Sequence, residues 1–141
     1  MAEDVPWYRR AVYTPAEGKE ADVSARSNFY HRAALWCHVP VCYGLGNLVH
    51  LWGQGTWLTL IGHTLAGINY TVAYALRSTN GEDYDVRRKE AAASACHLAA
   101  AMPRYMEHKT MKFVGFSSWY ACIAATYYVQ RWVFYGMQDE D

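Results

Sequence analysis

Histidine is the residue type in this sequence best suited to binding a metal or a haem, because a neutral imidazole nitrogen is a good ligand. The six histidines are His31, His38, His50, His63, His97 and His108. No two of them form an H-x-x-x-H or H-E-x-x-H pair, so the spacing predicts no metal site. His50 and His63 lie on successive apolar segments, where they could ligate a haem between two helices. Their unequal depths favour the alternative, in which each makes one hydrogen bond to a neighbouring helix.

Nucleophilic catalysis finds little support in the residue pattern. Ser117 and Ser118 lie in an apolar segment, and no apolar segment contains a carboxylate that could orient a histidine base. Gly44-Leu45-Gly46 lacks the third glycine of a phosphate-binding loop and also lies within an apolar segment. The sequence therefore predicts no catalytic residues and no enzyme activity of its own.

The elements that carry these residues are marked by two long gaps in charge. No Asp, Glu, Lys or Arg occurs in the 44 residues from Ala33 to Leu76, or in the 18 residues from Phe113 to Gln130. A helix that crosses a bilayer needs roughly 20 mostly apolar residues. The gaps predict three membrane spans, near 33–52, 57–76 and 113–135, with a turn at Gly53-Gln54-Gly55-Thr56. The alternative, a helical bundle with a buried hairpin, would normally keep a charged outer face.

The rest of the chain is polar. We expect an extended N-terminal arm over 1–32, a hairpin of two spans over 33–76, a polar loop over 77–112 and an acidic tail over 136–141. An Ala-rich stretch inside the loop, which Pro103 ends, predicts a short surface helix near 88–102. The predicted fold class is all-α and integral to a membrane, with about three transmembrane helices.

The basic residues orient this arrangement. Three spans place 12 of the 13 Lys and Arg residues, those of the arm and the loop, on one side of the membrane. An excess of basic residues marks the cytoplasmic or matrix side, so we expect the arm and loop there. Arg32, Arg77 and Lys112 then flank the spans and predict a site for an anionic phospholipid such as cardiolipin, or simple snorkelling anchors. The 13 acidic residues balance the charge, which argues against a nucleic-acid partner.

The segment His63-Thr64-Leu65-Ala66-Gly67 resembles the small membrane-anchor subunit of succinate dehydrogenase. In that family a histidine of the second span, followed four residues later by glycine, is a haem ligand. The resemblance implies that His63 binds haem b, and the position of His50 on the neighbouring segment makes it the candidate for a second ligand. The Asp-Tyr pair of the family's quinone site has no acidic member here, since Val72 and Ala73 precede Tyr74.

The whole sequence is also similar in character to supernumerary subunits of mitochondrial respiratory complexes, which are small and aromatic-rich. We therefore expect a non-catalytic accessory subunit of a respiratory complex in the mitochondrial inner membrane, with the arm and the 77–112 loop on the matrix side. Its partners would be other subunits and cardiolipin, and it would hold no cofactor. The alternatives are a haem- or quinone-site anchor subunit of succinate dehydrogenase, which would bind haem b, and a membrane-region subunit of ATP synthase.

Overall fold

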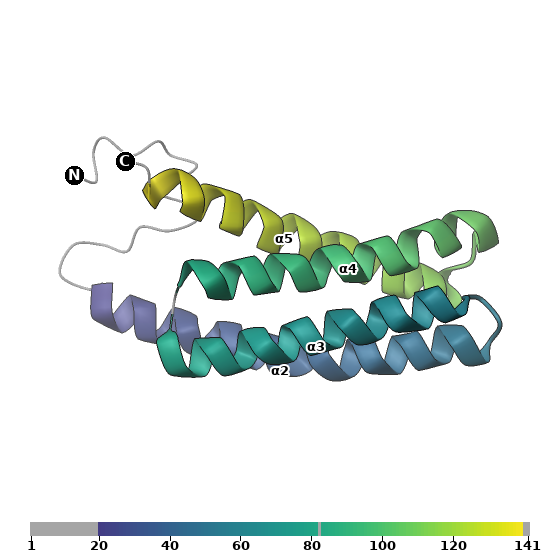
Figure 1. Cartoon of the computed structure of the whole chain (residues 1–141), viewed down its shortest axis with the longest axis horizontal. Helices are drawn as coiled ribbons and strands as arrows, with labels where there is room; N and C mark the ends of the chain where they lie inside the picture. Colours follow the sequence, from purple (N-terminus) through teal and green to yellow (C-terminus); the bar gives the residue numbers. More distant parts are fainter. Residues whose placement is uncertain (1–19, 82, 140–141) are drawn as a thin grey trace.

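The computed structural model describes residues 20–81 and 83–139, which form four long helices that run alternately up and down (Figure 1). These helices are α2 (Glu20–Leu51), α3 (Trp57–Asn80), α4 (Tyr84–His108) and α5 (Phe116–Asp139), with a short segment η2 (Met111–Gly115) before α5. Short connections join the helices, and antiparallel neighbours with short loops are typical of a four-helix bundle.

Local hydrogen bonds set the helix ends. The Thr56 N–H donates to Thr59 Oγ1 at 3.1 Å at the start of α3, and the Asp83 carboxylate accepts from the Tyr84 N–H at 2.8 Å at the start of α4. Such contacts satisfy backbone donors that have no partner within the helix. α4 ends at Lys109, which takes a left-handed conformation with φ 54° and donates its N–H to the Tyr105 carbonyl at 2.7 Å.

The turn between α2 and α3 is fixed from two sides by Gln54, which is buried. Its side-chain Oε1 accepts from the Val114 N–H at 3.2 Å, and its backbone oxygen accepts from Arg104 Nε at 3.0 Å. A residue of the turn therefore ties together the ends of α4 and η2 at one end of the bundle.

The four helices do not close into a complete ring. α3 and α4 pack against each other and each also packs against one outer helix, α2 or α5, but the backbones of α2 and α5 hardly approach each other. The core between the helices is built mainly from small and aromatic side chains, with one leucine: Leu35, Cys42, Ala66, Tyr70, Ala73, Ala93, Ala124 and Tyr128. Gly46 allows a close approach of α2 to α3, because a Cβ at this position would lie 2.6 Å from the Cβ of His63.

The predicted integral-membrane fold class is wrong. No helix in the part of the chain that the structure describes is both long enough and apolar enough to cross a bilayer. The segments near 33–52, 57–76 and 113–135 are instead parts of α2, α3 and α5, which pack in one bundle with α4. The uncharged segments place polar side chains such as His63 and Ser117 against each other in the core, and this polar content is what a count of charges does not register.

Two further predicted segments differ from the structure. Residues 20–32, expected to be extended, are the first turns of α2, while residues 1–19 lie outside the described residues. The expected short surface helix near 88–102 is the middle of α4, which continues past Pro103 to His108 and is a core element. Residues 136–139 of the expected acidic tail belong to α5, and residues 140–141 lie outside the described residues.

Candidate functional site

Five residues form a continuous line of hydrogen bonds through the centre of the bundle, which we call the core network. Its members are Cys42, His97, Ser117, His63 and Thr59. Ser117 Oγ lies 2.7 Å from His97 Nε2 and 2.8 Å from His63 Nε2. Each of the four helices contributes at least one member.

The direction of each hydrogen bond follows from the ends of the network. His63 Nδ1 lies 2.8 Å from the Thr59 carbonyl, which can only accept, so Nδ1 carries the proton. Nε2 of the neutral ring then accepts from the Ser117 hydroxyl, and Ser117 Oγ accepts from His97 Nε2. His97 Nδ1, 3.6 Å from Cys42 Sγ, is left to accept from the thiol. Each of the four hydrogen bonds of the core network therefore has one donor and one acceptor.

Burial keeps the core network uncharged. Cys42, His63, His97 and Ser117 have no exposed surface. Burial, together with the nearby His63 and His38, lowers the pKa of His97 to about 3, and burial also lowers the pKa of His63. Burial raises the pKa of the Cys42 thiol to about 12. Ser117 has no exposed surface, and the two imidazoles beside it are oriented by a carbonyl and a thiol, whereas the histidine of a catalytic triad is oriented by a carboxylate.

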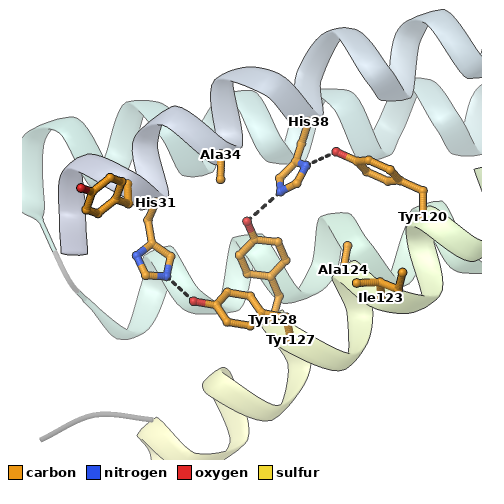
Figure 2. A pocket seen from close by; sticks show the side chains of 9 residues that line it. His31, Ala34, His38, Tyr120, Ile123, Ala124, Tyr127 and Tyr128 are labelled. Carbon is orange, nitrogen blue, oxygen red and sulfur yellow. Dashed lines mark hydrogen bonds between the residues drawn. The ribbon is translucent and has the colours of Figure 1, made fainter. Parts of the chain in front are cut away.

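A second cluster of histidines and tyrosines joins α2 to α5 (Figure 2). His38 contacts two phenols of α5: its Nδ1 bonds to the Tyr120 hydroxyl, and its Nε2 lies 2.9 Å from the Tyr128 hydroxyl. Nearer the start of α2, His31 Nε2 lies 2.7 Å from the Tyr127 hydroxyl. A pocket of about 500 Å³ lies among these side chains, where the backbones of α2 and α5 stay apart.

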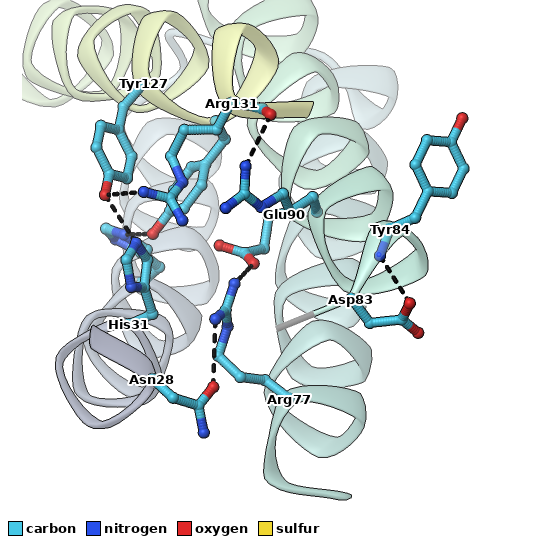
Figure 3. A network of polar contacts seen from close by, with 11 residues as sticks. Asn28, His31, Arg77, Asp83, Tyr84, Glu90, Tyr127 and Arg131 are labelled. Atoms are coloured by element: carbon cyan, nitrogen blue, oxygen red, sulfur yellow. Dashed lines mark hydrogen bonds and ion pairs between the residues drawn. The ribbon is translucent and has the colours of Figure 1, made fainter. Parts of the chain in front are cut away.

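A third cluster lies at the end of the bundle where α3 stops and α4 begins (Figure 3). Arg77 is fully buried and forms an ion pair with Glu90 of α4, while its Nη1 donates to Asn28 Oδ1 of α2 at 3.2 Å. Arg87 Nη1 donates to the Arg131 backbone oxygen of α5 at 3.0 Å. These contacts connect all four helices, and buried charges of this kind are stable only when they are paired.

The two histidines of the haem interpretation have different surroundings. Both ring nitrogens of His63 are hydrogen-bonded, one to Thr59 and one to Ser117. His63 could therefore bind iron only after it lost one of these two hydrogen bonds. His50 lies near the end of α2, with its ring centre 4.6 Å from that of Trp57 and the two rings tilted by 48°. No cluster of three or more potential metal ligands occurs among residues 20–81 and 83–139.

The three basic residues of the expected phospholipid site are not brought together. Arg77 is buried in its ion pair at the end of α3, and Arg32 lies partly buried in α2. Lys112 is exposed in η2, at the opposite end of the bundle from Arg77, with its ammonium group 5.0 Å from the centre of the Trp52 ring. Arg77 therefore has no exposed surface to offer a headgroup, and Lys112 lies too far along the bundle to share a site with it.

The sequence shows His97 as one of six histidines but does not predict that it is buried against Ser117. A signal was present: Arg87, Glu90, Ser94, His97 and Ala101 follow one another at intervals of three or four residues, which places them on one helix face. All five are buried. Because this face is polar, a search for apolar periodicity in α4 passes over the side that faces the core.

The outer surface of α3 carries a row of exposed apolar side chains, which we call the α3 stripe. Its members are Leu58, Ile61, Leu65, Ile68 and Val72. Intervals of three and four residues place them on one helix face, and their exposed fractions run from 37 to 77%. Nothing in the described part of the chain covers this face.

We compared the chain with known protein families, with curated proteins and with solved structures. No family model, no curated protein and no solved structure matches it.

Proposed function

We propose that this protein is a non-catalytic structural subunit of a multi-protein assembly and that it binds its neighbour through the α3 stripe. The observation that carries the proposal is the stripe itself. Contiguous exposed apolar residues of this extent are unusual on a free monomer and are typical of protein interaction sites. Their alternating spacing suits packing against a helix of a partner.

The polar residues beside the stripe support the same role. Thr64, Asn69 and Thr71 each donate a side-chain hydrogen bond to the backbone oxygen four residues earlier, at 2.9, 2.9 and 2.8 Å. A partner that covers this face would therefore leave neither threonine hydroxyl without an acceptor, and of the Asn69 amide only the second N–H would need one. Leaving such a group buried and unsatisfied costs about 1–3 kcal/mol, so the arrangement lowers the cost of docking.

The interior supports the non-catalytic part of the proposal. The histidines and the serine of the core network are buried and already hydrogen-bonded to one another, so they are not presented to a substrate. They connect the helices and so keep the α3 stripe on a rigid support.

The finer assignment rests on the sequence alone. We propose that the assembly is a respiratory-chain complex of the mitochondrial inner membrane, because the aromatic-rich composition and the absence of a catalytic motif resemble supernumerary subunits of such complexes. The bundle would associate with that complex through protein contacts of α3.

The test is native gel electrophoresis after mild detergent extraction of cells that produce the tagged full chain. We expect the wild-type chain to migrate with a large complex and Leu65→Asp to migrate alone, because a carboxylate in the middle of the stripe cannot be buried. Ala99→Asp, on the exposed face of α4, is the matched control and should migrate like the wild type. Circular dichroism must show both variants folded. A wild-type chain that migrates alone, or a folded Leu65→Asp that stays in the complex, contradicts the proposal.

A further inference from the structure

We propose that the pocket between α2 and α5 is a binding site for a neutral, flat aromatic molecule that carries a carbonyl oxygen. The pocket lies away from the α3 stripe, so this inference is independent of the assembly role. Three features support it: the space between the two helices, the nature of the walls and one hydrogen-bond donor that the protein itself does not use.

The space is held open by side chains that reach across it. The His38 bonds to Tyr120 and Tyr128 and the His31 bond to Tyr127 span the gap between α2 and α5 (Figure 2). The resulting volume of about 500 Å³ falls within the roughly 300–1,000 Å³ of sites for small organic ligands. No residue lining the pocket carries a carboxylate, an ammonium or a guanidinium group, which favours an uncharged ligand.

The walls are mainly aromatic and apolar. Tyrosine rings of both helices line the pocket, together with the small side chains Ala34 and Ala124 and the exposed side chain of Ile123. Aromatic rings pack well against other flat rings, by offset stacking or by edge contact. The small alanines leave room for such a ring between the two helices.

The unused donor follows from a count of hydrogens around His38. A neutral imidazole carries one N–H, and the phenols of Tyr120 and Tyr128 carry one O–H each, so three polar hydrogens serve two hydrogen bonds. Whichever ring nitrogen is protonated, the phenol that accepts from it keeps its own O–H free to donate. Burial lowers the pKa of His38 to about 4, so the ring is neutral near pH 7. Both phenols line the pocket, and a ligand carbonyl would accept the remaining hydrogen.

The test uses a matched pair of probes, 9-fluorenone and fluorene, which differ by a carbonyl in place of a methylene group. Titration of the full chain is followed by ligand-observed NMR. We expect fluorenone to bind about two- to twelve-fold more tightly than fluorene, the range that one net hydrogen bond provides. Equal affinity of the two probes, or no binding of fluorenone, overturns the proposal.

Two variants locate the site. Ala34→Leu fills the pocket and should weaken fluorenone binding more than ten-fold, whereas Ala33→Leu, on the exposed neighbouring position outside the pocket lining, should leave it unchanged. If Ala34→Leu does not fold, Ile123→Trp takes its place, because Ile123 lines the pocket but is 71% exposed. Unchanged fluorenone binding in a folded pocket-filling variant places the probe elsewhere and overturns the proposal.

Discussion

At the scale of single residues, the core network is the feature that distinguishes this bundle. Four of its members come from four different helices, and their hydrogen bonds are satisfied only when the helices have one relative register. A core of alanine and aromatic side chains accepts more than one packing arrangement at similar energy. Satisfied buried polar groups select one of these arrangements, because every other one leaves a donor or an acceptor without a partner.

Removing the central hydroxyl should therefore be costly. Ser117→Ala leaves His63 Nε2 without its donor and the His97 N–H without its acceptor, and each loss costs about 1–3 kcal/mol of the free energy of unfolding. The matched control is Ser118→Ala, because Ser118 is equally buried but contacts only the Met102 sulfur, at 3.2 Å. Urea unfolding of both variants checks the difference. A Ser117→Ala cost no larger than that of Ser118→Ala would contradict the importance of the network.

The buried histidines also predict a dependence of stability on pH. The pKa values of His38 and His97 are lowered by burial from 6.5 to about 4 and about 3, so only the unfolded chain takes up protons at these positions as the pH falls below about 6.5. The free energy of unfolding should be constant above pH 7 and should decrease from pH 6.5 toward pH 5. Urea unfolding between pH 8 and pH 5 measures this change, and His97→Gln should reduce its slope. A flat profile would show that these imidazoles titrate equally in both states.

At the scale of helices, the sequence predicts the turn between α2 and α3 more accurately than it predicts what surrounds each helix. The glycines of the turn at 53–56 and the apolar run after it predict a helix near 57–76, where α3 spans Trp57–Asn80. The helix that the sequence predicts near 88–102 is shorter than α4, because proline is expected to end a helix whereas Pro103 lies within this one. The core-facing surface of α4 could not be inferred from apolar periodicity. His97 and Glu90 are buried because residues distant in sequence supply their hydrogen-bond partners.

The residues that end α3 and α4 differ in how well they suit the backbone. Lys109 takes a left-handed conformation that favours glycine, so Lys109→Gly should raise the free energy of unfolding by a few tenths of a kcal/mol up to about 1 kcal/mol. Gly81, between α3 and α4, has φ 71° and ψ −140°, which other residues avoid, so Gly81→Ala should lower it by about 1–3 kcal/mol. Thermal unfolding monitored by circular dichroism compares the two. Shifts of the same sign would contradict this assignment of backbone strain.

At the scale of the whole molecule, the bundle has two inner helices and two outer ones. α3 and α4 are each packed on two sides, while α2 and α5 are each packed mainly on one inner helix and joined to each other by side chains. Helices with fewer packed neighbours open locally at lower free energy. This arrangement also explains why the charge pattern was misleading. Arg77 and Arg87 belong to the polar loop that the sequence predicts over 77–112, but in the structure they connect the helices inside the bundle.

Hydrogen exchange should follow this division. We expect the backbone amides in the middle of α3 and α4 to exchange more slowly than those in the middle of α2 and α5, by at least ten-fold. Mass spectrometry of peptides from each helix, after exchange of the intact protein, measures the rates. Equal protection of all four helices would mean that the bundle opens only as one unit.

The absence of charge in the α3 stripe also has a consequence for how the proposed assembly should respond to dissolved ions. Contacts between oppositely charged groups weaken as ionic strength rises, whereas contacts between apolar surfaces strengthen in sulfate and phosphate salts. The α3 stripe contains no ionisable group, so a complex held by it should survive a wash in concentrated salt and should dissociate in a solvent that dissolves hydrocarbon. That behaviour would distinguish this subunit from neighbours that are retained by their charges.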